Sequence, residues 1–298
     1  MYLIDQLTVV IVTYKTNKQI LDQCIKSILG KAKILIVENS YNKELKLSYE
    51  KNFPNLEVFL TGSNLGYGGG NNKGLSLVKT KYALISNPDV IYEEDFFNNL
   101  KTYIDEKTDF NIIGPLYRSN DYASHGYFDD LKNNKYQIDG LENESLIKTH
   151  WIVGCTMFIN LEKFENKKLF DENFFLFFEE FDLCKRTLIN GNLIYSSNKL
   201  LVKHLGFKGS FASDAKYEID ALKLKNWHYM WSQFYFNKKY EGIFISYIKG
   251  LASLLKNSIK ILFNVITNNK LETIKYKFRF SGLLSSMLTK KSSFRINF

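Results

Sequence analysis

The chain has 298 residues, of which 45% are hydrophobic and 24% charged, so it is long enough for one large folded domain and too apolar for wholesale disorder. Its net charge of +9 is concentrated near the C-terminus, since residues 238–298 hold 12 Lys or Arg and only two acids. A near-neutral body with a basic tail argues against a nucleic-acid-binding domain and favours a surface partner for the tail.

Two features of the sequence bear on where the chain works. Cys24, Cys155 and Cys184 fit no metal-binding or redox spacing, so we expect reduced thiols in the cytosol. The N-terminus enters an apolar run almost at once, with Asp5 inside it and no basic region or cleavage site. This pattern is not that of a signal peptide.

Apolar runs alternate with helical patterns over roughly the first 115 residues. The runs typical of buried strands are Leu7–Tyr14, Lys33–Glu38, Leu56–Leu60, Tyr82–Ser86 and Asn111–Pro115. The segments with helical patterns are Asn17–Leu29, capped by Asn17, then Asn72–Lys79 and Glu94–Glu106. This alternation predicts an α/β domain with a doubly wound, mostly parallel sheet.

Beyond residue 115 the pattern is less regular. Tyr117–Lys148 has the composition of a loop or small hairpin over the site, and Trp151–Asn160 is a predicted strand. A helix is predicted at Phe174–Asn190, followed by short strands at Leu193–Tyr195 and Leu200–His204. These elements would complete the domain.

The strand Tyr82–Ser86 ends directly before Asn87-Pro88-Asp89. Ligands of open α/β sheets bind at the carboxyl ends of strands, so we expect Asp89 to face a cation and the phosphates of a nucleotide. Pro88 fixes its own φ and biases Asn87 away from the helical region, which predicts a sharp turn. The alternative is that these residues only cap the next helix.

The stretch Gly62–Gly74 is rich in glycine but matches neither a P-loop nor the dinucleotide fingerprint. A Rossmann dehydrogenase is rejected because no such fingerprint follows the first predicted strand. The glycines of this stretch would let the backbone approach a ligand closely, and Asn64, Asn71 and Asn72 could contact polar groups. The alternative is a mobile surface loop.

Five apolar residues, Phe174–Phe178, directly precede the acids Glu179, Glu180 and Asp182, and Arg186 follows. Burial raises the pKa of a carboxyl group toward neutrality, whereas a cation lowers it. A carboxylate tuned in this way is a candidate general base for a sugar hydroxyl. The alternative is that the acids only stabilise the start of a helix.

His204 lies at the end of a predicted strand and, with Asp89, could supply two ligands to a divalent ion that also bridges phosphates. A lone His is otherwise a structural residue. His125, His150 and His228 have no such context, and we expect them to be structural or surface residues.

Polar residues recur every three or four positions over Gly242–Thr267, namely at Ser246, Lys249, Ser253, Lys256, Asn257, Lys260 and Asn264. They form one stripe of a helix whose remaining surface is apolar, and the lysines interrupt any run long enough to span a bilayer. With the basic residues beyond it, this pattern predicts a helix that lies in the plane of a membrane surface. The alternatives are packing on the chain's own core or on a second subunit; nucleic acid is disfavoured because the basic residues adjoin aliphatic ones.

The motifs form an ordered set: Val12-Thr13-Tyr14, Glu38-Asn39-Ser40, Asn64-x-Gly66, Asn72-x-Gly74, Asn87-Pro88-Asp89, Trp151-x-x-Gly154, Phe170-Asp171-Glu172-x-Phe174-Phe175, Glu179-Glu180-x-Asp182-Leu183-Cys184-x-Arg186, and His204 with Ser210. This set, over roughly residues 7–240, resembles family 2 glycosyltransferases of the GT-A fold, in particular the bacterial rhamnosyltransferase-like branch. The resemblance implies a GT-A domain over residues 1–240, followed by a basic amphipathic tail over residues 241–298.

The resemblance further implies a metal-dependent, inverting transfer from a nucleotide-sugar. Glu38 and Asn39 would contact the nucleoside, and Asp89 and His204 would hold Mg²⁺ or Mn²⁺ on the diphosphate. A carboxylate of the Glu179-Glu180 pair would take the acceptor proton; the branch has Glu-Asp here, so the longer Glu180 and its neighbour both stay candidates. The other positions expected to contact the substrates are Thr13, Tyr14, Asn64, Gly66, Asn72, Asn87, Trp151, Asp182 and Arg186.

For the substrates, the resemblance favours L-rhamnose from dTDP-rhamnose and a lipid-linked saccharide acceptor in O-antigen or capsule synthesis. A UDP-hexose or UDP-galactofuranose donor is the alternative within the same fold. A non-catalytic nucleotide-sugar-binding membrane adaptor is the alternative in another class. Together with the basic tail over residues 242–298, this predicts a cytoplasmic protein, peripheral on the inner face of a bacterial membrane.

Overall fold

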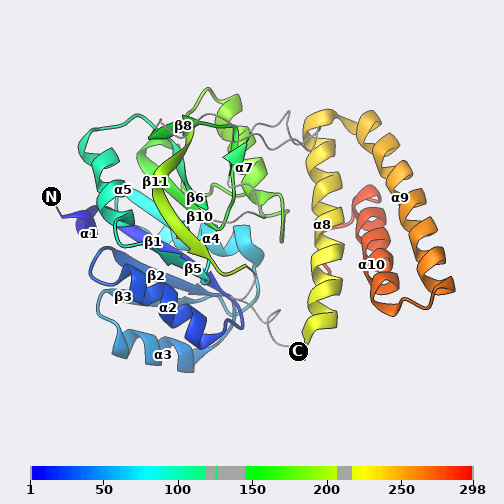
Figure 1. Ribbon diagram of the computed structural model, residues 1–298, viewed down its shortest axis with the longest axis horizontal. Helices are drawn as coiled ribbons and strands as arrows, with labels where there is room; N and C mark the ends of the chain where they lie inside the picture. Colours follow the sequence, from blue (N-terminus) through cyan, green and yellow to red (C-terminus); the bar gives the residue numbers. More distant parts are fainter. Residues whose placement is uncertain (1, 118–124, 127–144, 207–216, 297–298) are drawn as a thin grey trace. The chain divides into compact units, whose positions relative to one another are not determined.

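The computed structural model describes residues 2–117, 125–126, 145–206 and 217–296 of the chain (Figure 1). Most of the predicted loop Tyr117–Lys148 lies outside the described residues, and so does Ser210 of the last motif. The positions that carry the other motifs are all described.

Contacts divide the chain into two compact units. The first consists of Met1–Phe170 with Glu180–Ser210, and the second of Asp171–Glu179 with Phe211–Phe298. The helix that ends near residue 240 therefore groups with the tail. This division rests on contacts alone, so the functional boundary between a domain over residues 1–240 and a tail over residues 241–298 stays a prediction.

The first unit is built on a mixed sheet. Its strands are β1 (Leu7–Thr13), β2 (Lys33–Glu38), β3 (Leu56–Leu60), β4 (Tyr82–Ser86), β5 (Val90–Tyr92), β6 (Ile112–Tyr117), β8 (Leu146–Lys148), β10 (Thr156–Asn160) and β11 (Ile194–His204). Their order is β3-β2-β1-β4-β10-β6-β11-β5, with β8 added to β11. Strands β3, β2, β1 and β4 are parallel, β10 runs antiparallel between β4 and β6, and β11 is parallel to β6. The predicted α/β class with a mostly parallel sheet is confirmed.

Side chains that alternate along the strands fill two apolar layers, one on each face of the sheet. Val9 and Ile11 of β1 belong to the first layer, and Val10 belongs to the second. Residues of α2, α3 and α5 join the first layer, and residues of α4 and α7 join the second. The helices of this unit are α1 (Leu3–Gln6), α2 (Lys18–Ile28), α3 (Lys43–Asn52), α4 (Gly66–Leu77), α5 (Phe96–Asp105), the 3₁₀ helix η1 (Leu161–Lys163) and α7 (Glu179–Ile189), except that Glu179 groups with the second unit.

The predicted strand Trp151–Asn160 is interrupted. It consists of β9 (Trp151–Ile152), which pairs with β7 (His125–Gly126), and of β10 in the main sheet. Between them the carbonyl of Gly154 accepts the Tyr67 hydroxyl, and the carbonyl of Cys155 accepts the N–H of Asn87 at 2.7 Å. These hydrogen bonds satisfy backbone carbonyl groups at the point where the strand pairing is interrupted.

The two short strands predicted between residues 193 and 204 form the single strand β11, which contains a bulge. The register with β6 shifts between Ser197 and Leu201. Before the bulge Ile194 belongs to the second apolar layer, whereas after it Val202 belongs to the first. The bulge therefore exchanges the faces to which alternate side chains point.

The predicted helix Phe174–Asn190 begins only at Glu179. Phe177 and Phe178 have φ values of 70° and 69°, in the left-handed region, where a right-handed helix cannot continue. The helical pattern of this segment was therefore misleading before α7.

The glycine-rich stretch, predicted as a ligand loop or a mobile loop, is helical from Gly66 onward and forms α4. A Cβ at Gly70 would lie 2.7 Å from Cγ1 of Val12, and one at Gly74 would lie 2.4 Å from Cγ1 of Val10. Glycine thus lets α4 pack closely on β1, which outweighs its low helix propensity.

Three long helices make up most of the second unit: α8 (Glu218–Glu241), α9 (Ile243–Ile266) and α10 (Lys270–Met287), coloured yellow to red in Figure 1. Met230 and Phe234 of α8 pack with Leu283 and Met287 of α10. A Cβ at Gly282 would lie 2.1 Å from the carbonyl oxygen of Trp227, so this glycine permits the close approach of α10 to α8.

His228 of α8 is a structural residue. Its Nδ1 lies 2.9 Å from the hydroxyl of Ser292, and its Nε2 lies 2.9 Å from the carbonyl oxygen of Phe294. Burial lowers the pKa of His228 to about 3, so the imidazole is neutral near pH 7.

The predicted amphipathic helix over Gly242–Thr267 is α9. Its buried residues are polar or small, and they are Ser246, Gly250, Asn257 and Asn264. The helix thus packs within its unit through the polar stripe rather than through its apolar side. Within the described residues, no helix has both the length and the apolar character needed to cross a bilayer.

Candidate functional site

The carboxyl ends of the parallel strands bring several predicted site residues to one edge of the sheet. Thr13 at the end of β1 pairs with Glu38 at the end of β2, and Ile11 pairs with Ser86 at the end of β4. Asn87 follows β4 directly. This edge is where open α/β sheets bind ligands.

Asp89 and His204 meet at this edge, although they are far apart in the sequence. Oδ1 of Asp89 lies 3.3 Å from Nε2 of His204, and the Asp89 side chain is buried. Two backbone links hold them: β5 pairs Val90 with His204, and the N–H of Leu205 donates to the carbonyl of Asp89 at 3.0 Å. The sheet thus fixes one carboxylate beside one imidazole.

A second group of polar residues forms a connected network at the ends of β1 and β2. The Thr13 hydroxyl donates to Oε2 of Glu38 at 2.5 Å, and the Ser40 hydroxyl donates to Oε1. Burial raises the pKa of Glu38, although these two hydrogen bonds act in the opposite direction. The N–H of Tyr14 donates to the Thr16 hydroxyl at 3.3 Å, next to this network.

Asn39 links the network to the start of α4. Its N–H donates to the carbonyl of Thr13 at 2.8 Å, and its Nδ2 donates to the carbonyl of Gly66 at 2.9 Å. The N–H of Gly66 in turn donates to Oδ1 of Asn64 at 3.0 Å. The buried Oδ1 of Asn39 has no hydrogen-bond donor among the described residues, so it is available to accept one from a ligand.

Glu180 lies against the turn between β9 and β10. A Cβ at Gly154 would lie 3.0 Å from Cβ of Glu180, so a side chain at this position would crowd the acid. Cys155, the next residue, accepts the hydrogen bond from Asn87, two positions before Asp89. Burial raises the pKa of Glu180 to about 7. Its neighbour Glu179 is buried and belongs to the second unit.

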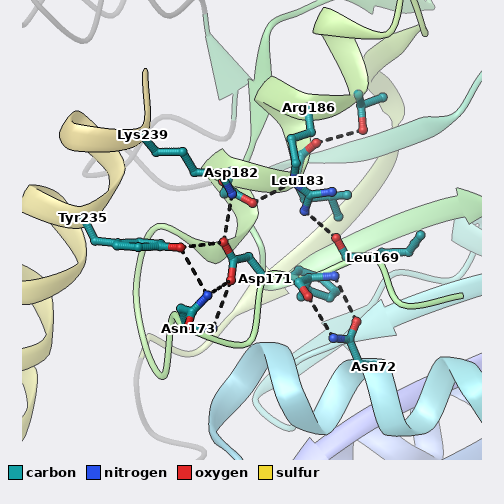
Figure 2. A network of polar contacts seen from close by, with 11 residues as sticks. Asn72, Leu169, Asp171, Asn173, Asp182, Leu183, Arg186, Tyr235 and Lys239 are labelled. Carbon is teal, nitrogen blue, oxygen red and sulfur yellow. Dashed lines mark hydrogen bonds and ion pairs between the residues drawn. The ribbon is translucent and has the colours of Figure 1, made fainter. Parts of the chain in front are cut away.

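Asn72 and Arg186 hold the backbone of the segment before α7 (Figure 2). Nδ2 of Asn72 donates to the carbonyl of Phe170, and the N–H of Phe170 donates to Oδ1 of Asn72, both at 2.9 Å. Arg186 donates to the Leu169 carbonyl and, at 2.8 Å, to Oδ2 of the buried Asp182. The geometry gives these side chains a positioning role, and their contact with substrate stays a prediction.

Trp151 is buried, with its ring edge-on to that of Phe181 at a centroid distance of 5.2 Å. It packs β9 against α7, the helix that carries Glu180. A residue that the sequence did not single out, Tyr67, bonds to the carbonyl of Gly154 beside Glu180. No spacing or composition signal marks this contact, because it joins residues in distant parts of the chain.

In the second unit, Asp171 anchors its own segment to α8 (Figure 2). Its carboxylate accepts from Lys239 at 2.8 Å and from the Tyr235 hydroxyl at 3.1 Å, and Oδ1 accepts from Nδ2 of Asn173 at 2.8 Å. Burial alone would raise the pKa of Asp171, but the bonds from Lys239 and Asn173 hold it below its ordinary value. Neither Tyr235 nor Lys239 stood out in the sequence.

Asp89 and His204 are the residues that could hold a divalent cation. Among the described residues no three His, Cys, Asp or Glu side chains converge on one point. A carboxylate oxygen and an imidazole nitrogen fit two positions around Mg²⁺ or Mn²⁺, and diphosphate oxygens and water are suitable donors for the others.

A sequence model described as glycosyl transferase family 2 matches residues 8–167, more than half of the chain. The low-salt glycan biosynthesis hexosyltransferase Agl10 of Haloferax volcanii is 26% identical over 194 residues, 62% of this chain and 62% of that protein. The rhamnosyltransferase WbbL of Escherichia coli K12 is 26% identical over 153 residues, 45% of this chain and 58% of that protein. The chain thus spans less than two thirds of the length of either relative.

Among solved structures, the mannosyltransferase PcManGT from Pyrobaculum calidifontis, in complex with GDP-Man and Mn²⁺, matches with a TM-score of 0.54 at 11% identity. The match covers 96% of this chain and 88% of that one. At this identity the likeness shows the fold alone, which is the GT-A fold that the sequence predicted.

Proposed function

The chain belongs to glycosyl transferase family 2, and we propose that it moves a sugar from a nucleotide-sugar to an acceptor hydroxyl with inversion at the anomeric carbon. The observation that carries this proposal is the Asp89–His204 pair, 3.3 Å apart at the carboxyl edge of the sheet. A cation held at such an edge can bind a nucleotide diphosphate, and this pair offers two donors for one.

In this proposal the Thr13–Glu38–Asn39 network holds the nucleoside. The Oδ1 atom of Asn39, buried and without a donor among the described residues, would accept an N–H of the base. Glu38 is fixed by two hydroxyl donors, so its carboxylate keeps one orientation toward the ribose or base. The network would hold the nucleotide-sugar in position before the transfer reaction begins.

Asp89 and His204 would hold the diphosphate end through Mg²⁺ or Mn²⁺. When bound, the cation supplies positive charge that stabilises the diphosphate as it leaves. Asp89 is buried and backbone-anchored, so its oxygen needs little reorganisation during the reaction.

Glu180 is the proposed general base. A pKa of about 7 leaves a sizeable ionised fraction near neutral pH and makes the carboxylate a competent proton acceptor. The acceptor proton passes to Glu180 while the acceptor oxygen bonds to the anomeric carbon. The bond from that carbon to the diphosphate oxygen breaks on the opposite face. Glu179 is the second candidate, because it is the adjacent acid at the start of α7.

For the donor we propose dTDP-rhamnose, supported by the similarity to the E. coli rhamnosyltransferase and by the motif set. The name of the Haloferax relative, a hexosyltransferase, supports the alternative of a hexose from a UDP-sugar. For the acceptor we propose a saccharide linked to a membrane lipid, in cell-surface polysaccharide synthesis. A nucleotide-sugar-binding adaptor without activity is the remaining alternative.

A donor panel tests these alternatives. The full chain with Mn²⁺ or Mg²⁺ is incubated with dTDP-rhamnose, UDP-glucose and UDP-galactofuranose, and release of the nucleoside diphosphate is measured. We expect release from dTDP-rhamnose above the other two, and its loss when the metal is chelated. Release only from a UDP-sugar would show that the donor is a UDP-sugar rather than dTDP-rhamnose. Binding of a nucleotide-sugar without release of the nucleoside diphosphate would favour the adaptor.

A further inference from the structure

Helix α9 (Ile243–Ile266) carries a continuous apolar band on the side opposite to its packed side. The buried positions Ser246, Gly250, Asn257 and Asn264 all lie on one stripe. Six apolar side chains that recur every three or four residues on the other side are 54–74% exposed: Ile248, Leu251, Leu255, Ile259, Leu262 and Ile266. The band runs along most of a helix that is roughly 36 Å long.

The contacts of the packed side fix this orientation. A Cβ at Gly250 would lie 3.0 Å from Sδ of Met287 and 3.1 Å from Cε2 of Phe234. The hydroxyl of Tyr247 donates to the carbonyl of Met287. A rotation that buried the apolar band would push leucine and isoleucine side chains into the space that Gly250 leaves for α8 and α10, so the band stays outside.

Charge distinguishes this band from an ordinary hydrophobic patch. Helix α9 contains no Asp or Glu, and its three lysines, Lys249, Lys256 and Lys260, are exposed. At 100° per residue these lysines fall together along one border of the apolar band. Such lysines can extend their amino groups toward anionic headgroups while the band enters the boundary of the acyl chains.

We propose that the outward face of α9 docks on an anionic lipid surface, with the helix axis in the membrane plane. The inference deepens the proposed function by naming the surface at which a lipid-linked acceptor would be met, and only that link rests on the proposed function. Docking itself follows from the apolar band, the bordering lysines and the 12 basic residues against two acids over residues 238–298.

A second copy of the chain fits this face less well. A two-fold interface places the same patch on both partners, so the lysine border of one helix would meet a surface of α9 that holds no acid. An anionic lipid surface supplies negative charge to Lys256 and Lys260, whereas Lys249 already pairs with Glu241 at 2.5 Å. Insertion across the bilayer is not the arrangement proposed, because no described helix is suited to it.

Vesicle co-sedimentation tests the proposal. The full chain is mixed with vesicles of phosphatidylcholine and phosphatidylglycerol in equal amounts, or of phosphatidylcholine alone. We expect binding to the anionic vesicles and at least tenfold weaker binding of the double variant Leu255→Glu/Ile259→Glu. Lys256→Gln should weaken binding to the anionic vesicles by about fivefold, the effect of one lysine at such a surface.

Leu47→Glu is the matched control. Leu47 is 69% exposed on α3, in the other unit, compared with 64% for Leu255. It should leave vesicle binding unchanged, since it adds one glutamate, as at Leu255 in the double variant, at a similar exposure but outside the band. Circular dichroism should show all variants folded, because only exposed side chains change.

Two outcomes would overturn the proposal. One is equal vesicle binding by the wild type and the double variant. The other is a wild-type dimer in light scattering that the double variant converts to a monomer without any change in vesicle binding, which would assign the face to a second subunit. Donor hydrolysis measured without vesicles reports on the proposed function separately, so a failure of docking is distinguishable from a failure of activity.

Discussion

The two units use buried polar side chains in opposite ways. In the α/β unit the buried Glu38 and Asp89 lie where strands end, each beside another group that can bind or exchange a proton, and Asp89 faces the partly exposed His204. In the helical unit Asn257 and Asn264 lie in the inward stripe of α9, where compact side chains allow close helix packing. In this chain, buried polar side chains form the candidate site where strand ends meet at one edge of the sheet, whereas in the helical unit they serve helix packing.

The largest effect that sharpens this comparison is expected at Asp89. Asp89→Asn keeps the shape of the side chain but removes the negative charge beside His204. Sugar transfer should fall by about 10³-fold, measured as kcat/KM for the active donor, because the cation and the diphosphate lose an anchor. The free energy of unfolding should change by about 1 kcal/mol or less.

Asp105→Asn is the control for this variant. Asp105 is an exposed carboxylate on α5 that pairs with Lys101 and lies away from the strand ends. It should keep near-full activity. Equal activity losses in the two variants, or a collapse of stability for Asp89→Asn alone, would place Asp89 among the structural polar groups.

In the helical unit the largest effect should be on stability, at Gly282. Gly282→Ala puts a methyl group 2.1 Å from the carbonyl oxygen of Trp227, a backbone atom that cannot move aside. We expect a loss of about 3 kcal/mol in the free energy of unfolding, at the upper end of overpacking effects, measured by denaturant titration. Gly250→Ala should cost less, because its methyl would meet the flexible end of Met287. The reverse ranking would contradict the packing described here.

The pH dependence of activity should report on Glu180. Because burial raises its pKa to about 7, the acid is protonated below that pH and cannot accept the acceptor proton. The kcat/KM value should therefore fall about tenfold for each pH unit below 7. Glu180→Gln should lower kcat by about 10²-fold, whereas Glu179→Gln should keep both activity and profile. Near-full turnover by Glu180→Gln would transfer the role to Glu179.

A smaller effect is expected at His228, which has no part in the proposed chemistry. Its folded pKa of about 3 lies below the unfolded value, so only the unfolded chain binds a proton between about pH 6.5 and 3. The stability contribution is complete above pH 6.5 and decreases as the pH falls through this window, by at most about 1.4 kcal/mol per unit. His228→Gln should flatten this decrease in equilibrium unfolding experiments; an unchanged slope would contradict the assignment.

The sequence predicted the first strands and their edge because each strand carries a local signal. Leu7–Thr13 and Lys33–Glu38 are apolar runs that end in polar residues, and the parallel register then brings Thr13 beside Glu38. The sequence also indicated that Asp89 follows one strand and His204 ends another, and the structure places them 3.3 Å apart; their joint binding of a metal stays a prediction. Local patterns suffice where strand ends decide the geometry.

Other features depend on contacts between distant segments. The segment Phe174–Phe178 has a helical composition, but the rings of Phe177 and Phe178 pack on Tyr229, and the backbone is left-handed there. In α4, glycines form a helix because they fit against β1. For α9 the spacing of the polar residues indicated which side of the helix is apolar, but it could not indicate which side packs against α8 and α10.

The bulge in β11 determines to which face of the sheet each later side chain of the strand points. Pro115 and Leu116 are consecutive in β6, but their partners in β11, Ser197 and Leu201, are separated by the three residues Asn198–Leu200. An odd number of extra residues reverses the alternation of side chains between the two faces of the sheet. His204 stands beside Asp89 only because of this reversal. A single-residue deletion at Asn198 would remove the reversal but also move His204 one position closer to Ser197; the two changes cancel, so the imidazole should keep its present face of the sheet beside Asp89.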